Sequence, residues 1–158
     1  MDADAIEIRP AEDADRRRLA LLFATVAEER DGIAAEPPID VDERAADWRL
    51  DGCFVAVAHG QVVGSLHLMP SRFGYGELGM MVAREWRRRG VGSALVAAAI
   101  DAGRMQGLHK LTLSVFPHND AALALYRKFG FVEEGRRVKQ MRRASGELWD
   151  LIEMGLLL

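Results

Sequence analysis

The sequence predicts an α/β fold, in which a mixed sheet of about seven strands carries about four helices on its two faces. Short apolar runs typical of strands alternate with segments that have the period of an amphipathic helix. Fifteen Gly and five Pro residues include several that separate these segments as turn residues. With 158 residues, 49% of them hydrophobic, the chain can bury one sizeable core, so we expect a single domain over residues 1–158.

The first part of the chain predicts a strand, two helices and a hairpin of strands. Pro10 and the Pro37-Pro38 pair end regular segments because proline cannot continue them. The compact turn His59-Gly60-Gln61 joins two apolar runs, which we expect to pair in antiparallel fashion. In chain order the expected elements are a strand at 5–9, a helix at 14–29, a short helix from Asp40 or Asp42 to Leu50, and strands at 53–58 and 62–69.

The second part predicts four more strands and two helices. Gly107 and Gly130 end the two helices, since glycine readily adopts the left-handed conformation found after a helix. Pro117 ends a strand with alternating apolar residues, and Ser145-Gly146 marks a turn between the last two strands. The expected elements are a strand at 77–83, a helix at 93–106, a strand at 111–115, a helix from Asn119 or Asp120 to about Phe129, and strands at 131–143 and 147–157.

Composition excludes several classes of protein. The formal net charge is −3, so the basic surface of a dedicated nucleic-acid binder is not expected. The single cysteine, Cys53, indicates a reducing compartment, and without a His-Glu-x-x-His motif we expect no metal site. The segment Met1 to Ala5 is acidic, and no run of 18 apolar residues occurs, so we expect neither a signal peptide nor a membrane span and predict a cytoplasmic protein.

The densest chemical signal lies between residues 80 and 93, where an apolar strand runs into a basic turn that opens a helix. Backbone N–H groups at a helix N-terminus have no acceptor within the helix and lie at the positive end of its dipole. Gly90 and Gly92 leave room for a phosphate, and Arg87, Arg88 and Arg89 add positive charge. The segment predicts an anion site; a tight turn with solvated arginines is the alternative.

Two common phosphate loops do not fit this segment. A Walker loop requires Gly-Lys-Ser/Thr, and none of the three lysines follows a glycine. A dinucleotide fingerprint requires a third glycine where Leu95 stands. Nucleotide hydrolysis of the Walker type and dinucleotide binding are therefore not predicted.

Two motifs in the chain resemble those of the GCN5-related N-acetyltransferase (GNAT) superfamily. The resemblance covers nearly the whole chain, and its core extends from Glu77 to Phe131. Arg84 stands where the family often has proline. The motifs are the loop Arg87-x-x-Gly90-x-Gly92 with its lead-in Val82-Ala83-Arg84-Glu85-Trp86, and the later segment Asn119-x-x-Ala122-x-x-Leu125-Tyr126-x-x-Phe129-Gly130-Phe131.

The resemblance implies that acetyl-coenzyme A (acetyl-CoA) binds where two central strands splay apart. It implies that backbone groups of Met81 and Val82 hold the pantetheine arm and that Asn119 bonds the arm from the other side. Asn119 is also a good helix N-cap, and both roles can coexist. The resemblance further assigns the pyrophosphate to backbone N–H groups of the loop, namely those of Arg88, Arg89, Gly90, Val91, Gly92 and Ser93.

The same resemblance implies two catalytic residues. Tyr126, two helical turns after Asn119, would give a proton to the departing thiolate; its alternative is a half-buried core tyrosine. Glu77 would take a proton from the acceptor amine, because an ammonium ion has no lone pair with which to attack; its alternative is an exposed carboxylate. His118 and His67 are weaker candidates for the base.

We therefore expect an acetyl-CoA-dependent N-acetyltransferase that acts on a primary amine of a small molecule or peptide N-terminus by direct attack. A transferase of longer acyl groups and a noncatalytic CoA-binding sensor remain alternatives, and the chain is expected to be a monomer or homodimer. Residues 28–47 contain eight carboxylates and two arginines, a net charge of −6 that would attract a cationic acceptor or simply be solvated. Residues 136–143 contain five basic residues and no acidic one, and a solvated strand face explains them better than a nucleic-acid contact.

Overall fold

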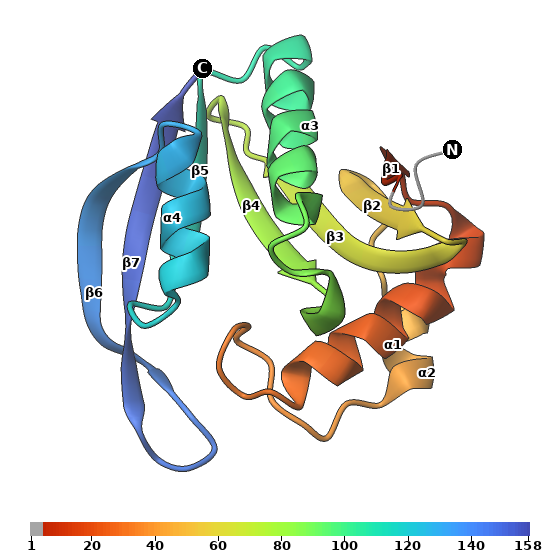
Figure 1. The fold of residues 1–158 in the computed structure, drawn as a ribbon. Helices are drawn as coiled ribbons and strands as arrows, with labels where there is room; N and C mark the ends of the chain where they lie inside the picture. Colours follow the sequence, from red (N-terminus) through yellow and green to blue (C-terminus); the bar gives the residue numbers. More distant parts are fainter. Residues whose placement is uncertain (1–4) are drawn as a thin grey trace. The chain divides into compact units, whose positions relative to one another are not determined.

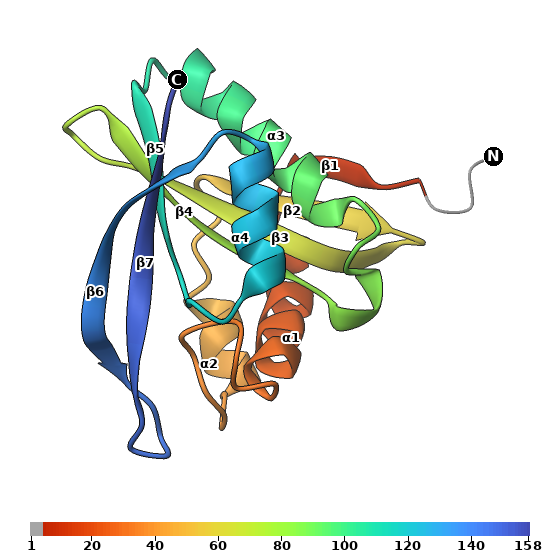
Figure 2. The ribbon, with the colours of Figure 1, turned by 60° about the vertical axis from the view of Figure 1, so that its left-hand side comes forward.

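A computed structural model describes residues 5–158, which form seven strands, four α-helices and two short 3-10 helices (Figures 1 and 2). The strands belong to one sheet in the order β1-β2-β3-β4-β5-β7-β6, with parallel and antiparallel pairs. This confirms the predicted mixed sheet and the predicted number of elements. The expectation that the chain has no signal peptide rests on the segment Met1 to Ala5, of which residues 1–4 lie outside the described residues. Within residues 5–158, none of the helices has the length and hydropathy needed to cross a membrane.

The chain divides into two compact units. The first contains the residues up to Leu68 together with Gly79–Ala99, and the second contains Met69–Leu78 together with Ile100–Leu158. Strands β3 (Gln61–Pro70) and β4 (Tyr75–Val82) and helix α3 (Val91–Met105) contribute residues to both units. A single domain over the whole chain stays a prediction.

The first unit follows the predicted order with shifted boundaries. Pro10 lies inside the first strand and not after it, which the sheet tolerates because this strand lies at the edge and pairs only with β2 among the described residues. Asp40 caps the second helix by accepting a hydrogen bond from the backbone N–H of Glu43. The elements are β1 (Glu7–Pro10), η1 (Asp13–Asp15), α1 (Arg16–Ala27), α2 (Val41–Ala46), β2 (Cys53–Ala58) and the start of β3.

Helices cover both faces of β3 in the first unit. A Cβ atom added at Gly64 would meet the side chains of Val91 and Leu95, so α3 packs on the face to which Gly64 points. His67, three residues along the strand, points to the opposite face, where it stacks on Trp48 after α2. Trp48 in turn packs against Phe23 of α1, with ring centroids 5.9 Å apart. Successive residues of a strand alternate between faces, so α3 and α1 lie on the two sides of the sheet.

The second unit contains β5 (Lys110–Val115), α4 (Asp120–Lys128), β6 (Val132–Arg142) and β7 (Leu148–Leu157). Strands β6 and β7 run side by side as a long hairpin (Figures 1 and 2). The parallel register of β4 with β5 covers Tyr75–Glu77 opposite Lys110–Thr112, although both strands continue beyond these residues. This short pairing is what splayed central strands require. Strand β4 begins two residues before its predicted start because Tyr75 already pairs with Lys110.

An Asp15→Asn substitution should lower the free energy of unfolding by about 2–3 kcal/mol at pH 7. Asp15 is 2% exposed, and both of its carboxylate oxygens accept hydrogen bonds from Arg9, at 2.7 and 3.0 Å. The bond from Arg9 holds the pKa of Asp15 below its ordinary value. This stabilisation is therefore present above about pH 4 and is lost as the pH falls further through the pKa of the folded state.

Urea unfolding of both proteins at pH 7 and pH 3 measures this effect, and the difference between them should shrink at pH 3. Asp13→Asn is the matched control, because Asp13 pairs with Arg16 at 2.7 Å but its side chain is 88% exposed. We expect the control to change stability by at most about 0.5 kcal/mol. Equal losses for the two variants would contradict the prediction.

Candidate active site

Strand β4 ends at Val82 and leads through a short turn into α3. The backbone N–H of Ala83 donates to the carbonyl of Val63 at 2.8 Å, so the chain leaves the sheet at a fixed point. The 3-10 helix η2 (Arg84–Trp86) and a turn at residues 87–90 follow, and the first helical bond of α3 runs from Ala94 N–H to Gly90 C=O. Met81, predicted to hold a ligand through its backbone, has a buried side chain, and Val82 is half-buried.

The turn before α3 has left-handed backbone conformations at two positions. Gly90 has a φ of 86°, in the left-handed region, and a Cβ atom added there would meet nothing within 4 Å in residues 5–158. Arg88 has a φ of 59°, so the backbone changes direction twice within three residues. The N–H groups in the first turn of α3, at Val91, Gly92 and Ser93, follow directly. This geometry fits a phosphate held by backbone donors at the positive end of a helix of 15 residues.

Two of the three arginine side chains of this turn, those of Arg87 and Arg89, have partners among the described residues. Arg87 donates two hydrogen bonds to the carboxylate of Glu29, at 2.7 and 2.8 Å, and a third from Nε to the carbonyl of Val82. These bonds hold the pKa of Glu29 below its ordinary value. The guanidinium of Arg89 lies 3.9 Å from the ring centroid of Trp86. Arg87 therefore fastens the loop to the residues after α1, a role that the sequence did not reveal.

The second motif lies in the second unit, on α4. The side-chain oxygen of Asn119 accepts a hydrogen bond from the N–H of Ala122 at 3.2 Å, so Asn119 is the N-cap of α4. The ring of Tyr126 packs against that of Phe131, with centroids 5.7 Å apart, and the residue is 8% exposed. Burial raises the pKa of Tyr126 to about 12. The Tyr126 hydroxyl thus stays protonated over the pH range in which most enzymes work.

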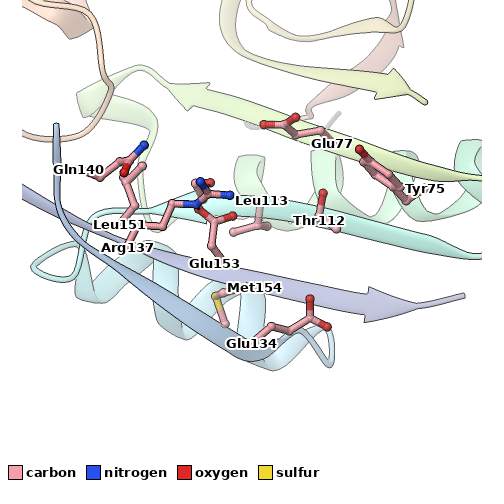
Figure 3. A pocket seen from close by; sticks show the side chains of 11 residues that line it. Tyr75, Glu77, Thr112, Leu113, Glu134, Arg137, Gln140, Leu151, Glu153 and Met154 are labelled. Atoms are coloured by element: carbon pink, nitrogen blue, oxygen red, sulfur yellow. Dashed lines mark hydrogen bonds and ion pairs between the residues drawn. The ribbon is translucent and has the colours of Figure 1, made fainter. Parts of the chain in front are cut away.

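A cavity of about 380 Å³ lies in the second unit and is lined by Glu77 (Figure 3). The carboxylate of Glu77 is exposed and makes no hydrogen bond or ion pair with any residue from 5 to 158. Thr112 lies opposite Glu77 in the strand register and also lines the cavity. A Cβ atom added at Gly103 of α3 would contact Leu111, which precedes Thr112 on β5. Neighbouring residues of a strand point to opposite faces, so α3 lies on the face of β5 opposite to Thr112.

The other charged residues of the cavity are paired. Glu153 accepts hydrogen bonds from Ser114 Oγ at 2.8 Å and from Arg137 Nε at 3.1 Å. Glu134 forms an ion pair with Lys110 at 2.8 Å. Glu77 is therefore the carboxylate of this cavity that has no cationic partner among the described residues. A carboxylate that accepts a proton or binds an ammonium group must be unpaired in this way.

The two histidines considered as bases lie elsewhere. His67 hydrogen-bonds through Nε2 to the carbonyl of Arg49 at 2.7 Å, and burial lowers the pKa of its ring. His118 stacks on Phe116, with centroids 5.6 Å apart, and contacts Trp149 edge to face. Neither residue lines the cavity that contains Glu77.

Sequence reasoning missed Arg137, Ser114 and Glu153 as members of a possible site. It grouped Arg137 with a basic strand face, because the strand pairing that brings it to Glu153 links residues 16 positions apart. The alternation of polar residues on β5, at Lys110, Thr112 and Ser114, was the available signal. The loop residues belong to the first unit, whereas Glu77, Asn119 and Tyr126 belong to the second.

Comparisons with known proteins show the family of the chain. Residues 20–131 match the acetyltransferase (GNAT) family. The chain is 34% identical over 117 residues to the L-amino acid N-acetyltransferase AaaT of Escherichia coli, covering 71% of the chain and 72% of that protein. It is 30% identical to the L-methionine sulfoximine/L-methionine sulfone acetyltransferase of Pseudomonas aeruginosa, covering 94% and 92%. It spans less than half, 40% and 46%, of two other curated relatives.

Solved structures give the same result. The ribosomal-protein-alanine N-acetyltransferase from Brucella melitensis superposes with a TM-score of 0.86 at 30% identity, over 96% of this chain and 99% of that one. The family match includes both the loop before α3 and the segment from Asn119 to Phe131. With both motifs and the whole fold accounted for, the chain belongs to the acetyltransferase (GNAT) family and is an acetyltransferase enzyme.

Proposed function

We propose that the enzyme transfers the acetyl group of acetyl-CoA to a primary amine of an amino acid or a peptide N-terminus, by direct attack in a ternary complex. The observation that carries the proposal is the carboxylate of Glu77, which lines a cavity of small-molecule size and has no partner among the described residues. The names of the Escherichia coli and Pseudomonas aeruginosa relatives, which describe amino-acid and amino-acid-like acceptors, support this class of substrate.

The residues before α3 fit the pyrophosphate of acetyl-CoA. The left-handed Gly90 and the absence of protein atoms near its missing Cβ leave the backbone open to a phosphate. We assign the pyrophosphate to the N–H groups of residues 88–93 and the pantetheine arm to the backbone of Met81 and Val82. Acetyl-CoA supplies the activated acetyl thioester; the chain's own residues position it and move the protons.

Glu77 accepts a proton from the acceptor, which arrives mainly as an ammonium ion. The neutral nitrogen then attacks the thioester carbonyl carbon, a C–N bond forms and the C–S bond breaks. The nitrogen then loses its second proton to solvent water, and the departing thiolate takes one proton from solvent water. Because the pKa of Tyr126 is about 12, its hydroxyl is a lasting hydrogen-bond donor, and we assign it the stabilisation of the thiolate as the C–S bond breaks.

An acceptor panel tests the proposed function. Release of free thiol from acetyl-CoA is measured with L-amino acids, their carboxamides, short peptides, simple amines and polyamines, and acetylated products are confirmed by mass spectrometry. We expect turnover with at least one α-amine. Binding of acetyl-CoA without turnover of any amine would instead support a noncatalytic sensor, and absence of binding would contradict both functions.

Replacing Glu77 with Gln should lower kcat/KM about 100-fold at pH 7, because the amide cannot take a proton from the acceptor. The defect should shrink toward pH 9, where a larger share of the acceptor amine is already neutral. Steady-state kinetics from pH 6 to pH 9.5 provide the measurement. Glu133→Gln, an exposed neighbour on β6 that does not line the cavity, is the control and should keep wild-type rates. A Glu77→Gln enzyme with a pH profile parallel to that of the wild type would rule out Glu77 as the base.

A further inference from the structure

We propose that Arg137 binds the carboxylate of the acceptor, so that the cavity selects free amino acids over amines that lack a carboxylate. This inference rests on the proposed function and adds a residue that determines specificity. Figure 3 shows Glu77 approaching the cavity from β4 and Arg137 approaching it from β6. An ammonium group and a carboxylate on one small molecule match these two opposite charges.

Among residues 5–158, Arg137 is held in place through one nitrogen only. Its Nε donates to Glu153 Oε1 at 3.1 Å, while its side chain remains 59% exposed. A guanidinium group carries five N–H bonds in a fixed plane, and the four on the two Nη atoms are separate from Nε. Two Nη atoms in one plane match the two oxygens of a carboxylate. Arg137 can therefore bind a carboxylate without giving up Glu153.

Glu153 is in turn fixed from the neighbouring strand. Ser114 lies directly opposite Glu153 in the β5–β7 register, and its Oγ donates to the same Oε1 atom at 2.8 Å. Ser114, Glu153 and Arg137 thus form a chain of hydrogen bonds across β5, β7 and β6. An arginine held in this way loses less conformational freedom when it binds an anion than a freely moving one does.

The charges of the cavity favour a zwitterion of this orientation. Lys110 pairs with Glu134, and Arg137 pairs with Glu153 through Nε, which leaves Glu77 for the ammonium end and the Nη atoms of Arg137 for the carboxylate end. Arg137 is the cationic side chain among the described lining residues, so a ligand carboxylate has one place to go. The volume of about 380 Å³ is adequate for a single amino acid.

Arg136 provides a matched control on the same strand. Its Nε pairs with Asp150 at 2.7 Å, much as Arg137 pairs with Glu153, and its side chain is 49% exposed. Arg136 does not line the cavity. Loss of its charge therefore removes an ion pair of the same kind from β6 without removing a donor from the site.

The experiment compares each L-amino acid of the acceptor panel with its own carboxamide, using rates expressed per neutral amine. For the best pair, we expect the wild-type enzyme to favour the free acid at least about 10-fold in kcat/KM. Arg137→Gln should lower kcat/KM for the acid at least about 30-fold, chiefly through KM, and change the value for the carboxamide less than about threefold. Arg137→Lys should restore part of the preference, and Arg136→Gln should leave both rates within about twofold.

Three outcomes would overturn the inference. The first is a wild-type enzyme that favours the carboxamide, as repulsion from the carboxylates of the cavity would produce. The second is an Arg137→Gln enzyme that loses the same factor with both acceptors while unfolding at the wild-type urea concentration. The third is that the enzyme acetylates only amines that lack a carboxylate. This result would contradict the inference but would still support the proposed acetyl transfer. If no amine is acetylated, the proposed function fails together with the inference.

Discussion

Replacing Tyr126 with Phe should lower kcat about 100-fold and leave the KM values for acetyl-CoA and acceptor within about threefold. The substitution removes the hydroxyl that we assign to the departing thiolate, a charge that develops only as the C–S bond breaks. A factor of about 100 corresponds to about 2.7 kcal/mol of lost transition-state stabilisation. Because burial raises the pKa of Tyr126 to about 12, the wild-type rate should show no decline from tyrosine ionisation up to pH 10.

The aromatic ring provides an internal check on this variant. The phenyl ring of the Tyr126→Phe protein retains the packing against Phe131, so the free energy of unfolding should change by no more than about 1 kcal/mol. Calorimetric titration with CoA should give a dissociation constant close to that of the wild type. A kcat within about twofold of the wild-type value would mean that Tyr126 serves the core alone, which was its alternative interpretation from the sequence.

Replacing Gly90 with Ala should raise the dissociation constant for acetyl-CoA at least about 10-fold. An alanine at a φ of 86° costs about 1–2 kcal/mol in backbone strain, but its Cβ would meet no protein atom within 4 Å. The methyl group would therefore obstruct only a ligand that approaches the backbone at this point. Isothermal titration with acetyl-CoA measures the effect on binding, and urea unfolding measures the strain.

Gly107→Ala separates strain from obstruction. Gly107 follows the other end of α3 with a φ of 74°, and a Cβ there would also meet nothing within 4 Å. Both variants should lose similar amounts of stability, since both place alanine in the left-handed region. Equal affinities of the two variants for acetyl-CoA would show that Gly90 does not face the pyrophosphate.

Local chemistry in the sequence predicted most of the fold. The Asn119 cap begins α4, Gly130 follows its end, and the His59-Gly60 turn joins β2 to β3 because both residues adopt left-handed conformations, with φ values of 50° and 71°. The ends of helices and strands that depend on contacts with other segments differ from the predicted ones. Pro10 belongs to β1, and the expected helix at 14–29 begins with the 3-10 helix η1 and continues as α1 only from Arg16 to Ala27. Asp15, turned back toward Arg9, explains this division.

The candidate site was predictable only where it is continuous in sequence. The loop at 87–93 combines glycine, arginine and a helix start within a few residues, so its chemistry is visible without a structure. Arg87 pairs with Glu29, 58 positions away, and Arg137 pairs with Glu153 across a hairpin. Contacts of this kind are set by the packing of distant segments. No local pattern distinguishes such a paired arginine from a solvated one.

Strand β6 forms one end of the sheet and therefore presents a row of backbone groups along its open side. Its pairing with β7 shifts register at two points, and Lys139 adopts a left-handed φ of 51° while its N–H turns to Asp150. Arg136, Arg137 and Arg142 add charge along its length. Irregular backbone and repeated positive charge both oppose the addition of a foreign strand. The four exposed basic residues of β6, Arg136, Arg137, Lys139 and Arg142, thus protect an otherwise long and exposed edge from edge-to-edge aggregation.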